Sequence, residues 1–249
     1  MDGGAFPTML SIITLFLIGG AGGLTGSLLG ACILVALIVL GVLMTFLVSR
    51  LLSATILKGV PSSFTLEMPP YRRPQILKVI VRSIVDRTLK VLGRAVISAA
   101  PAGLLIWVLA NVPLSGQTTL LTALTGFLDP FARRLGMDGC ILTGFLLGLP
   151  ANEIVVPIII MTYMARGSLL EVEGVQLMQL FTANGWTWIT AVSTLLFSLM
   201  HWPCATTLLT IRKESGSLKW TLLSFLVPTV CGIILCFLFT TAALFLFPA

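Results

Sequence analysis

Two long apolar runs in this chain are each interrupted at a proline, and each interruption carries ionisable or metal-binding side chains. In the first run, GCILTGFLLGLPANEIVVPIIIMTYMA, Glu153 is the only charged residue between Asp138 and Arg166. The second run breaks at the letters HWPC, which begin with His201, the only histidine of the chain. An ionisable side chain at bilayer depth costs roughly 2.5–3.5 kcal/mol on insertion scales, so it marks a functional site by default. The two runs therefore predict a membrane protein with a polar site at its broken helices.

The composition supports a membrane protein and excludes a single soluble core. The chain is 57% hydrophobic and 10% charged, with a mean hydropathy of +1.07, whereas a soluble domain carries about 25% charged residues. Most basic residues fall between Arg50 and Arg94. Such clustering in one inter-helix segment is typical of a cytoplasmic loop, so the net charge of +6 does not indicate nucleic-acid binding.

The pattern of apolar segments predicts an all-α polytopic membrane protein. We expect the first membrane helices in residues 1–57, a cytoplasmic connector with an amphipathic helix in 58–93, a module with both broken runs in 94–220, and a last transmembrane helix in 221–249. Residues 27–49 would form a helix of about 34 Å, long enough for the hydrocarbon core of about 30 Å.

Two further segments suit the membrane interface. Residues 75–92 carry charges every four positions and apolar residues on the other face, which predicts an amphipathic helix along the cytoplasmic surface. Residues 117–136 are moderately apolar and suit an interfacial or re-entrant piece better than a full span.

The lengths of the broken runs place both interruptions inside the bilayer. Helices over 139–149 and 154–165 would be about 16 Å and 18 Å long, so neither alone crosses the membrane. The second run, 186–211, either spans or forms a re-entrant hairpin. The basic connector that follows, 212–219, favours the hairpin, because simple alternation from residue 94 would otherwise place it outside the cytoplasm.

The candidate ligands lie at the two breaks. Cys204 and Glu153 are the best candidates for metal ligands, with Asn152 and His201 in support. Thiolate, imidazole and carboxylate together suit a divalent first-row ion such as iron or zinc. Each residue also has a structural alternative: Glu153 could cap a restarting helix, and His201 could bond a freed carbonyl.

The remaining cysteines and motifs carry no chemistry of their own. Four cysteines are interpreted as small buried hydrophobes: Cys32, Cys140, Cys231 and Cys236. The chain has no phosphate-binding GxxxxGK[ST] loop and no HExxH, GxSxG or CxxC motif, so we expect no enzymatic activity and no resident cofactor.

The chain resembles the C-terminal half of the membrane domain of FeoB-type ferrous iron transporters. The stretches that carry the resemblance are SSFTLEMPPYRRP, DRTLKVLGRAV, AAPAGLLIW, GFLDPFARRLGMDG, LGLPANEIVVPIIIM, NGWTW and HWPCATTLLTIRKESGSLKW. The resemblance implies that residues 94–220 hold the second Gate, or nucleoside-recognition-like, module of the family. The Gate cysteine then falls on Cys204, and the PANEI segment falls on residues 150–154.

The resemblance also implies a substrate, a location and partners. Fe²⁺ would be the transported ion, and the protein would lie in a bacterial cytoplasmic (inner) membrane, in contact with the lipid bilayer. GTP would bind only to an N-terminal domain that is absent from this chain. The implied partners are a GTPase-containing N-terminal half, small Feo accessory proteins, or further copies of the chain.

The chain departs from the family pattern in two respects, and two other functions stay open. It lacks the GTPase domain, the helical regulatory domain and the first Gate module, and it has no cysteine near Gly3 and Gly4. It is therefore interpreted as a fragment, one half of a split transporter or a degenerate relative. The alternatives are a non-transporting membrane scaffold and a nucleoside-type transporter, although a nucleoside would need more polar groups near the breaks.

Overall fold

The computed structural model is almost entirely helical in its described residues, which confirms the predicted all-α class. The described residues are 9–10, 12–18, 24–55, 76–115, 118–164 and 174–246. The predicted polar connector at 58–74 lies outside them. Of the expected first membrane helices in residues 1–57, the part before residue 24 is described only as residues 9–10 and 12–18, which include the short π-helix η1 (Ile13–Leu17).

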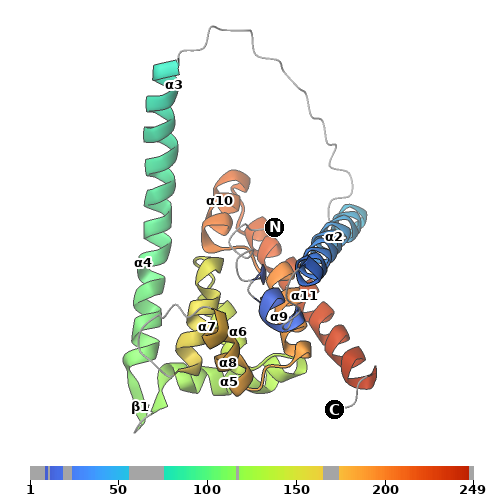
Figure 1. Cartoon of the computed structure of the whole chain (residues 1–249). Helices are drawn as coiled ribbons and strands as arrows, with labels where there is room; N and C mark the ends of the chain where they lie inside the picture. Colours follow the sequence, from blue (N-terminus) through green and yellow to red (C-terminus); the bar gives the residue numbers. More distant parts are fainter. Residues whose placement is uncertain are drawn as a thin grey trace.

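The elements follow one another along the chain as mostly short helices between longer ones (Figure 1). The remaining bounds are α2 Leu24–Thr55, α3 Ile76–Arg82, η2 Ser83–Leu89, α4 Lys90–Asn111, β1 Pro113–Ser115, β2 Thr118–Thr119, α5 Leu120–Arg134, α6 Gly139–Leu147, η3 Asn152–Ile154, α7 Val155–Tyr163, α8 Gly174–Ala183, α9 Trp188–Met200, α10 Ala205–Ser215 and α11 Leu218–Leu246. The two strands pair antiparallel, with Pro113 opposite Thr119.

Three segments of the described chain are long and apolar enough to cross a membrane. They are α2, the α9–α10 segment from Trp188 to Ser215, and α11. The predicted transmembrane helix at 27–49 lies within α2 and is confirmed as a long apolar helix. Phe46 on α2 is 70% exposed and Phe245 on α11 is 86% exposed. In a membrane protein such apolar faces suit contact with lipid.

The predicted amphipathic helix is not a separate element. Residues 76–111 form one continuous helix of α3, η2 and α4, in which the middle seven residues have π-helical hydrogen bonding. No glycine or proline lies between Ile76 and Leu92, so nothing in this stretch ends the helix before the expected span begins. Leu77 is 78% exposed and Ile84 is 55% exposed.

The first broken run folds back on itself as a helical hairpin of α6 and α7. A methyl group on Gly144 of α6 would lie 2.5 Å from Cγ1 of Ile159 in α7, so the two helices can approach this closely only at a glycine. Asp138, just before α6, is hydrogen-bonded to Tyr163, the last residue of α7. The two halves therefore lie side by side, which fits the expectation that neither half alone crosses the membrane. The break is the tip of this hairpin, and each nine-residue arm is about 14 Å long at 1.5 Å per residue.

The second broken run continues along a single partner helix instead of folding back. Contacts between this run and α11 advance in opposite directions along the two chains. From the start of α9 onward the contacts are Trp188 with Phe239, Ser193 with Cys236, Met200 with Gly232, and Trp202 with Phe225. The α9–α10 segment therefore runs antiparallel to α11 through its break, and the re-entrant hairpin lies at 139–163 instead of 186–211.

If the run at 139–163 is the one that folds back and 188–215 is the one that crosses, simple alternation from residue 94 no longer places the basic connector 212–219 outside the cytoplasm. In Figure 1, α10 lies about level with the middle of the long α3–α4 helix, and α5 and β1 lie at the bottom of the molecule. The last turn of α10 carries Arg212 and Lys213. Those basic residues therefore lie on the side of the core away from α5 and β1, which is also the side from which α3 extends.

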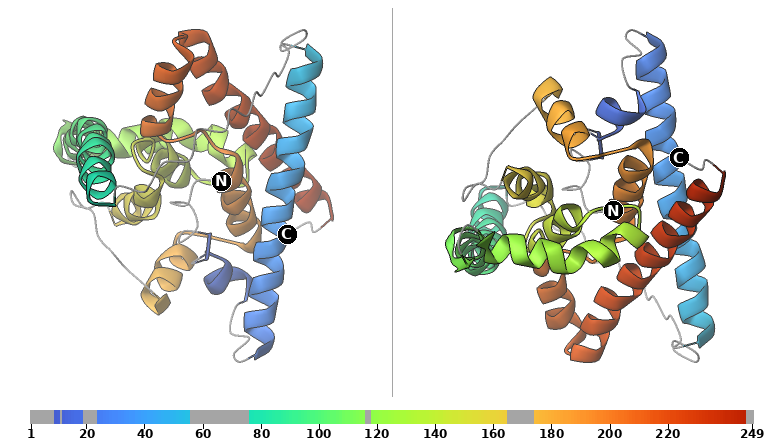
Figure 2. Two further views of the ribbon diagram at one scale, coloured as in Figure 1. Left: turned by 90° about the horizontal axis from the view of Figure 1, so that it is seen from above. Right: turned by 90° about the horizontal axis from the view of Figure 1, so that it is seen from below.

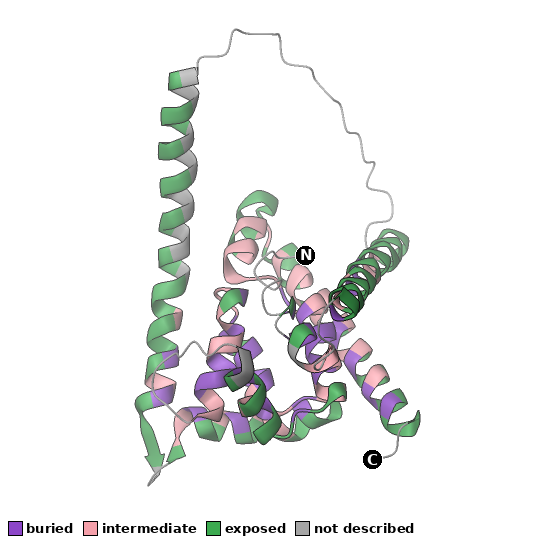
Figure 3. Ribbon diagram, in the orientation of Figure 1, coloured by how far each residue is buried: buried purple, intermediate pink, exposed green. Residues whose placement is uncertain are grey.

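The core lies between the hairpin and α9. Ile141, Phe145, Ile159, Leu195 and Phe197 are each at most 1% exposed. Buried residues gather on α6, α7 and α9, whereas α3, α4 and α2 are mostly exposed (Figure 3). Seen from above and below, α2 and the α3–α4 helix lie on opposite sides of this core (Figure 2). The hairpin is therefore the best-packed part of the described fold, although it does not span.

Candidate functional site

The two proline breaks meet in the structure. The backbone N–H of Ala205, the first residue of α10, donates a hydrogen bond to the carbonyl of Leu149 at the hairpin tip, with an N···O distance of 2.8 Å. First-turn amides of a helix have no partner within the helix, so α10 takes its acceptor from the hairpin. Pro150 and Pro203 direct the chain away from helix at the two sides of this contact. We call this contact the break junction.

Cys204 lies at the break junction as the N-cap residue of α10. Its side chain is half-buried, and Sγ lies 3.1 Å from the Oγ1 atoms of both Thr206 and Thr207. These two hydroxyls are in the first turn of α10, where no carbonyl of the same helix is within reach. The two hydroxyls and the sulfur form one small polar group at the start of α10, on the α10 side of the break junction.

His201 is fixed at the end of α9 by its own backbone. Its Nδ1 lies 2.8 Å from the carbonyl oxygen of Ser198. A carbonyl only accepts, so Nδ1 carries the proton and the lone pair is on Nε2. The ring packs against Phe145 and Phe197, with centroids 5.3 and 6.3 Å away. The structural role considered for His201 is thus present, and the same bond sets the tautomer that a metal ligand needs.

Glu153 and Asn152 lie on the hairpin side of the break junction, in η3. Asn152 is 6% exposed, whereas the Glu153 side chain is exposed. Neither η3 nor α7 has a side-chain cap, and Glu153 makes no hydrogen bond or ion pair within the described residues. The capping role considered for Glu153 is therefore not seen, and its carboxylate is accessible.

The four predicted residues do not form a closed metal centre. Among the described residues, no group of three or more His, Cys, Asp and Glu side chains lies close enough to hold a metal ion. The structure instead places Cys204 and His201 at one break, Asn152 and Glu153 at the other, and joins the two breaks through backbone.

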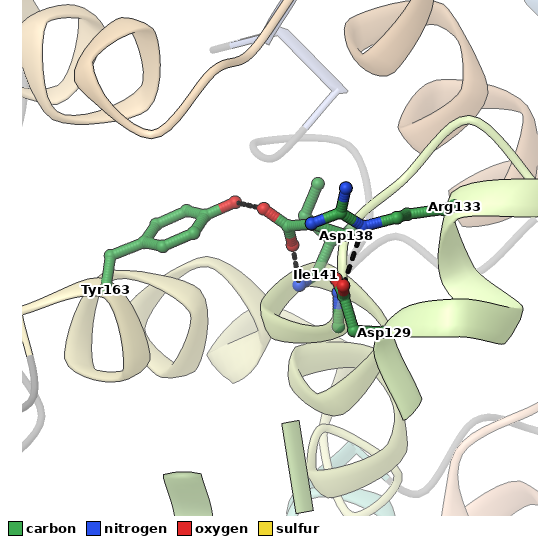
Figure 4. A network of polar contacts seen from close by, with 6 residues as sticks. Asp129, Arg133, Asp138, Ile141 and Tyr163 are labelled. Atoms are coloured by element: carbon green, nitrogen blue, oxygen red, sulfur yellow. Dashed lines mark hydrogen bonds and ion pairs between the residues drawn. The ribbon is translucent and has the colours of Figure 1, made fainter. Parts of the chain in front are cut away.

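A second polar cluster, at the base of the hairpin, was not predicted from the sequence (Figure 4). Asp138 caps α6 by accepting a hydrogen bond from the amide of Ile141 at 2.8 Å, and it also accepts one from the hydroxyl of Tyr163. The indole N–H of Trp186 donates to the same Tyr163 oxygen at 2.7 Å. We call Asp138, Tyr163 and Trp186 the base cluster.

Burial raises the pKa of the carboxyl group in the base cluster. Desolvation raises the pKa of Asp138 above its ordinary value of 3.8, and the hydrogen bond from Tyr163 partly opposes this shift. Beside it, Asp129 accepts from the amide of Gly139 at 3.0 Å and from Nε of Arg133 at 2.6 Å. The base of the hairpin is therefore fastened by side chains to α5 and to the residues before α9. The sequence could have predicted that Asp138 caps α6, because Asp138 directly precedes an apolar run, where an N-cap residue is expected.

The aromatic and cysteine predictions have mixed outcomes. Trp186 is buried and stacks on Phe181 with centroids 4.2 Å apart, as expected for a packing residue. The four cysteines expected to be buried are not alike: Cys236 is buried, Cys140 and Cys231 are half-buried, and Cys32 is exposed. The prediction was wrong for Cys32 because α2 turns much of its surface away from the protein.

Comparisons with known proteins match this architecture. The family model described as nucleoside recognition, or Gate, matches residues 92–218, and the one described as ferrous iron transport protein B C terminus matches residues 34–87. The Fe(2+) transporter FeoB of Staphylococcus aureus strain MSSA476 is 30% identical over 217 residues, which cover 83% of this chain and 31% of the relative.

More distant relatives agree. The Fe(2+) transporter FeoB of a Synechocystis strain is 28% identical over 84% of this chain and 33% of its own length. That of Methanocaldococcus jannaschii is 27% identical over 81% of this chain and 30% of its own length. The chain thus spans about a third of the length of these relatives. No solved structure matches it significantly.

Proposed function

The chain belongs to the Gate family and is a FeoB-type C-terminal membrane region, and from this premise we propose that it forms one half of an Fe²⁺ pathway through the membrane. The observation that carries the proposal is the break junction, where the amide of Ala205 meets the carbonyl of Leu149. It joins the two interrupted apolar segments. Asn152 and Glu153 lie within a few residues of one side of this contact, and His201 and Cys204 lie within a few residues of the other. Broken helices at bilayer depth are where transporters bind their ions.

Each residue has a role that follows from its chemistry. The exposed carboxylate of Glu153 attracts the divalent ion, and Cys204 binds it as a thiolate after releasing its proton to water. His201 offers Nε2, and Asn152 supports the hairpin tip. A borderline ion such as Fe²⁺ accepts sulfur, nitrogen and oxygen ligands together. Because few protein ligands meet at the break junction, water completes the coordination, and the ion is held loosely enough to leave.

The relatives are longer than this chain, which covers about a third of their length, and a working transporter would use further parts. GTP would act on the N-terminal domain that the longer relatives have room for, and the first Gate module would supply the other side of the pathway. We place the protein in a bacterial inner membrane as a multi-pass subunit. Small Feo accessory proteins, or further copies of the chain, are the partners to test.

The proposal is tested by Cys204→Ser in the transporter that contains this chain. Serine keeps the size of the side chain but is a poor ligand for a borderline metal. We expect ⁵⁵Fe²⁺ uptake at low iron to fall while the amount of membrane-inserted protein stays constant. Cys32→Ser, an exposed cysteine on α2, is the matched control and should leave uptake unchanged.

Three outcomes would decide against the proposal. Normal Fe²⁺ uptake in the Cys204→Ser protein would remove the thiol from the pathway. Loss of protein instead of activity would indicate a scaffold in which the broken helices serve packing. Uptake of radiolabelled uridine, insensitive to Cys204→Ser, would indicate a nucleoside-type transporter.

A further inference from the structure

Three helices converge directly behind the break junction. At the end of α9, a methyl group on Gly41 of α2 would lie 3.3 Å from Cδ1 of Leu199, and one on Gly232 of α11 would lie 3.2 Å from Cβ of Met200. The two glycines therefore let α2 and α11 close onto the last turn of α9 from two sides. The next residue of the chain is His201.

A partly open cavity with a volume of about 340 Å³ lies at this three-helix contact. Each of the three helices contributes one sulfur-bearing side chain to its wall: Met44 from α2, Met200 from α9 and Cys231 from α11. All three are half-buried. The other lining residues are Gly41, Thr45, Val48, Ser49, Leu52, Leu199, Val227 and Pro228. No carboxylate or imidazole is among them, so sulfur is the dominant donor.

The wall also carries two hydroxyl groups, those of Thr45 and Ser49, and oxygen of this kind is a harder donor than sulfur. The hydroxyl of Thr45 donates to the carbonyl of Gly41 at 2.8 Å, one turn back on its own helix. Its hydrogen is therefore already used within α2. Two thioethers and one thiol then remain as the soft groups of the cavity.

The softness and the charge of these sulfur donors favour a monovalent soft metal ion. Thioether and thiolate sulfur favour soft ions such as Cu⁺ over hard or borderline divalent ions. A thiolate at Cys231 would neutralise a monovalent ion, and the resulting neutral complex carries no net charge at bilayer depth. A divalent ion on the same ligands would keep a net positive charge, which the membrane penalises.

We propose that the cavity between α2, α9 and α11 is a binding site for a monovalent thiophilic metal ion of the Cu⁺ type, held by Met44, Met200 and Cys231. Binding is a coordination step without oxidation or reduction: a metal–sulfur bond forms at Cys231, and the thiol proton leaves to water. The site is separate from Cys204, which lies on the other side of the HWPC break, and it does not depend on Fe²⁺ transport.

The experiment is a Cu⁺ titration of the purified full chain in detergent, in competition with a chromophoric Cu⁺ chelator under reducing conditions. Cys231→Ala, Met44→Leu and Met200→Leu each remove one donor, and leucine conserves the volume of methionine. Loss of an outer-shell partner alone costs about 10–100-fold in metal affinity, so loss of a direct ligand should weaken Cu⁺ binding by at least that factor. Cys32→Ala and Met178→Leu, which do not line the cavity, are the matched controls.

The outcomes separate this site from the break junction. X-ray absorption of the Cu⁺-loaded protein should show a first shell of sulfur only, and Cys204→Ser should leave it unchanged. Cu⁺ affinity that survives Cys231→Ala but falls in Cys204→Ser would overturn the proposal by placing the metal at the break junction. Absence of Cu⁺ binding in the unmodified chain would also overturn it and leave the cavity as an apolar crevice for lipid.

Discussion

Removal of the Tyr163 hydroxyl should loosen the base of the hairpin. Tyr163→Phe keeps the ring in its place beside Phe181 but deletes the group that donates to Asp138 and accepts from Trp186. Removal of this single oxygen atom therefore breaks two hydrogen bonds, the one to Asp138 and the one from Trp186. The tip of the hairpin is unchanged, so the variant separates the base cluster from the break junction.

The expected cost follows from the two groups that lose their partner. A hydrogen bond to a charged acceptor is worth about 1.5–3 kcal/mol, and an orphaned buried N–H costs about 1–3 kcal/mol. Asp138 is only half-buried, so water replaces part of the first loss. We therefore expect a total of about 2–3 kcal/mol, which lowers the melting temperature of a protein of this size by about 2–4 °C per kcal/mol.

The effect should depend on pH, because the pKa of Asp138 is raised by desolvation. The folded state holds this proton more tightly than the unfolded state, so the contribution of Asp138 to stability is greatest below pH 3.8 and falls as the pH rises through its raised pKa. Tyr163 opposes the raised pKa, and its loss should therefore destabilise more at neutral pH than near pH 4.

The assay is thermal unfolding of the full chain in detergent, followed by tryptophan fluorescence at several pH values. Tyr163→Phe is compared with Asp138→Asn and with the double variant, so that the coupling between the two side chains is measured directly. Additive effects of the two changes, or a loss in Tyr163→Phe that is independent of pH, would refute the bond between Tyr163 and Asp138.

Three further predictions concern the hairpin and the break junction. Gly144→Ala should destabilise the protein by about 1–3 kcal/mol through overpacking against Ile159, whereas Gly126→Ala, where an added methyl meets nothing within 4 Å, should be neutral or stabilising in the same melting assay. Trp202→Phe should change stability by less than about 1 kcal/mol, because its buried indole N–H has no acceptor in the described part of the chain; a large fall in melting temperature would mean that the N–H is bonded. Thr206→Val with Thr207→Val should weaken Co²⁺ binding at Cys204 about 10–100-fold, measured by the thiolate-to-metal absorption band, and the two serine substitutions should restore it; equal affinity in all three proteins would contradict a role of the hydroxyls.

The sequence predicted the helical class and the two breaks because both depend on local chemistry. A run of 23 apolar residues determines the helix α2 locally. Pro150 and Pro203 likewise interrupt the helices in which they occur. The same local reasoning could not decide which broken run folds back, because GLPAN and HWPC interrupt their helices alike. The difference is tertiary: Gly144 allows α7 to lie against α6, whereas the α9–α10 run has α11 as a continuous partner.

The base cluster was missed for a similar reason. Asp138, Tyr163 and Trp186 are separated by 25 and 23 residues, and only the hairpin brings them together. In the sequence alone, Asp138 is the charged residue at the start of an apolar run, and Trp186 is interpreted as a packing residue. Both descriptions are correct, but neither contains the hydrogen bond through Tyr163.

The measurement that tests the central claim most directly is a reversible cross-link across the break junction during Fe²⁺ uptake. Leu149→Cys and Ala205→Cys replace the two residues joined by the backbone hydrogen bond, in a protein that retains Cys204 and has alanine at its other four cysteines. We predict that oxidation links the hairpin tip to the start of α10 and stops ⁵⁵Fe²⁺ uptake, and that a reductant restores it. Failure to form the link, or full uptake by the linked protein, would contradict a pathway at the break junction.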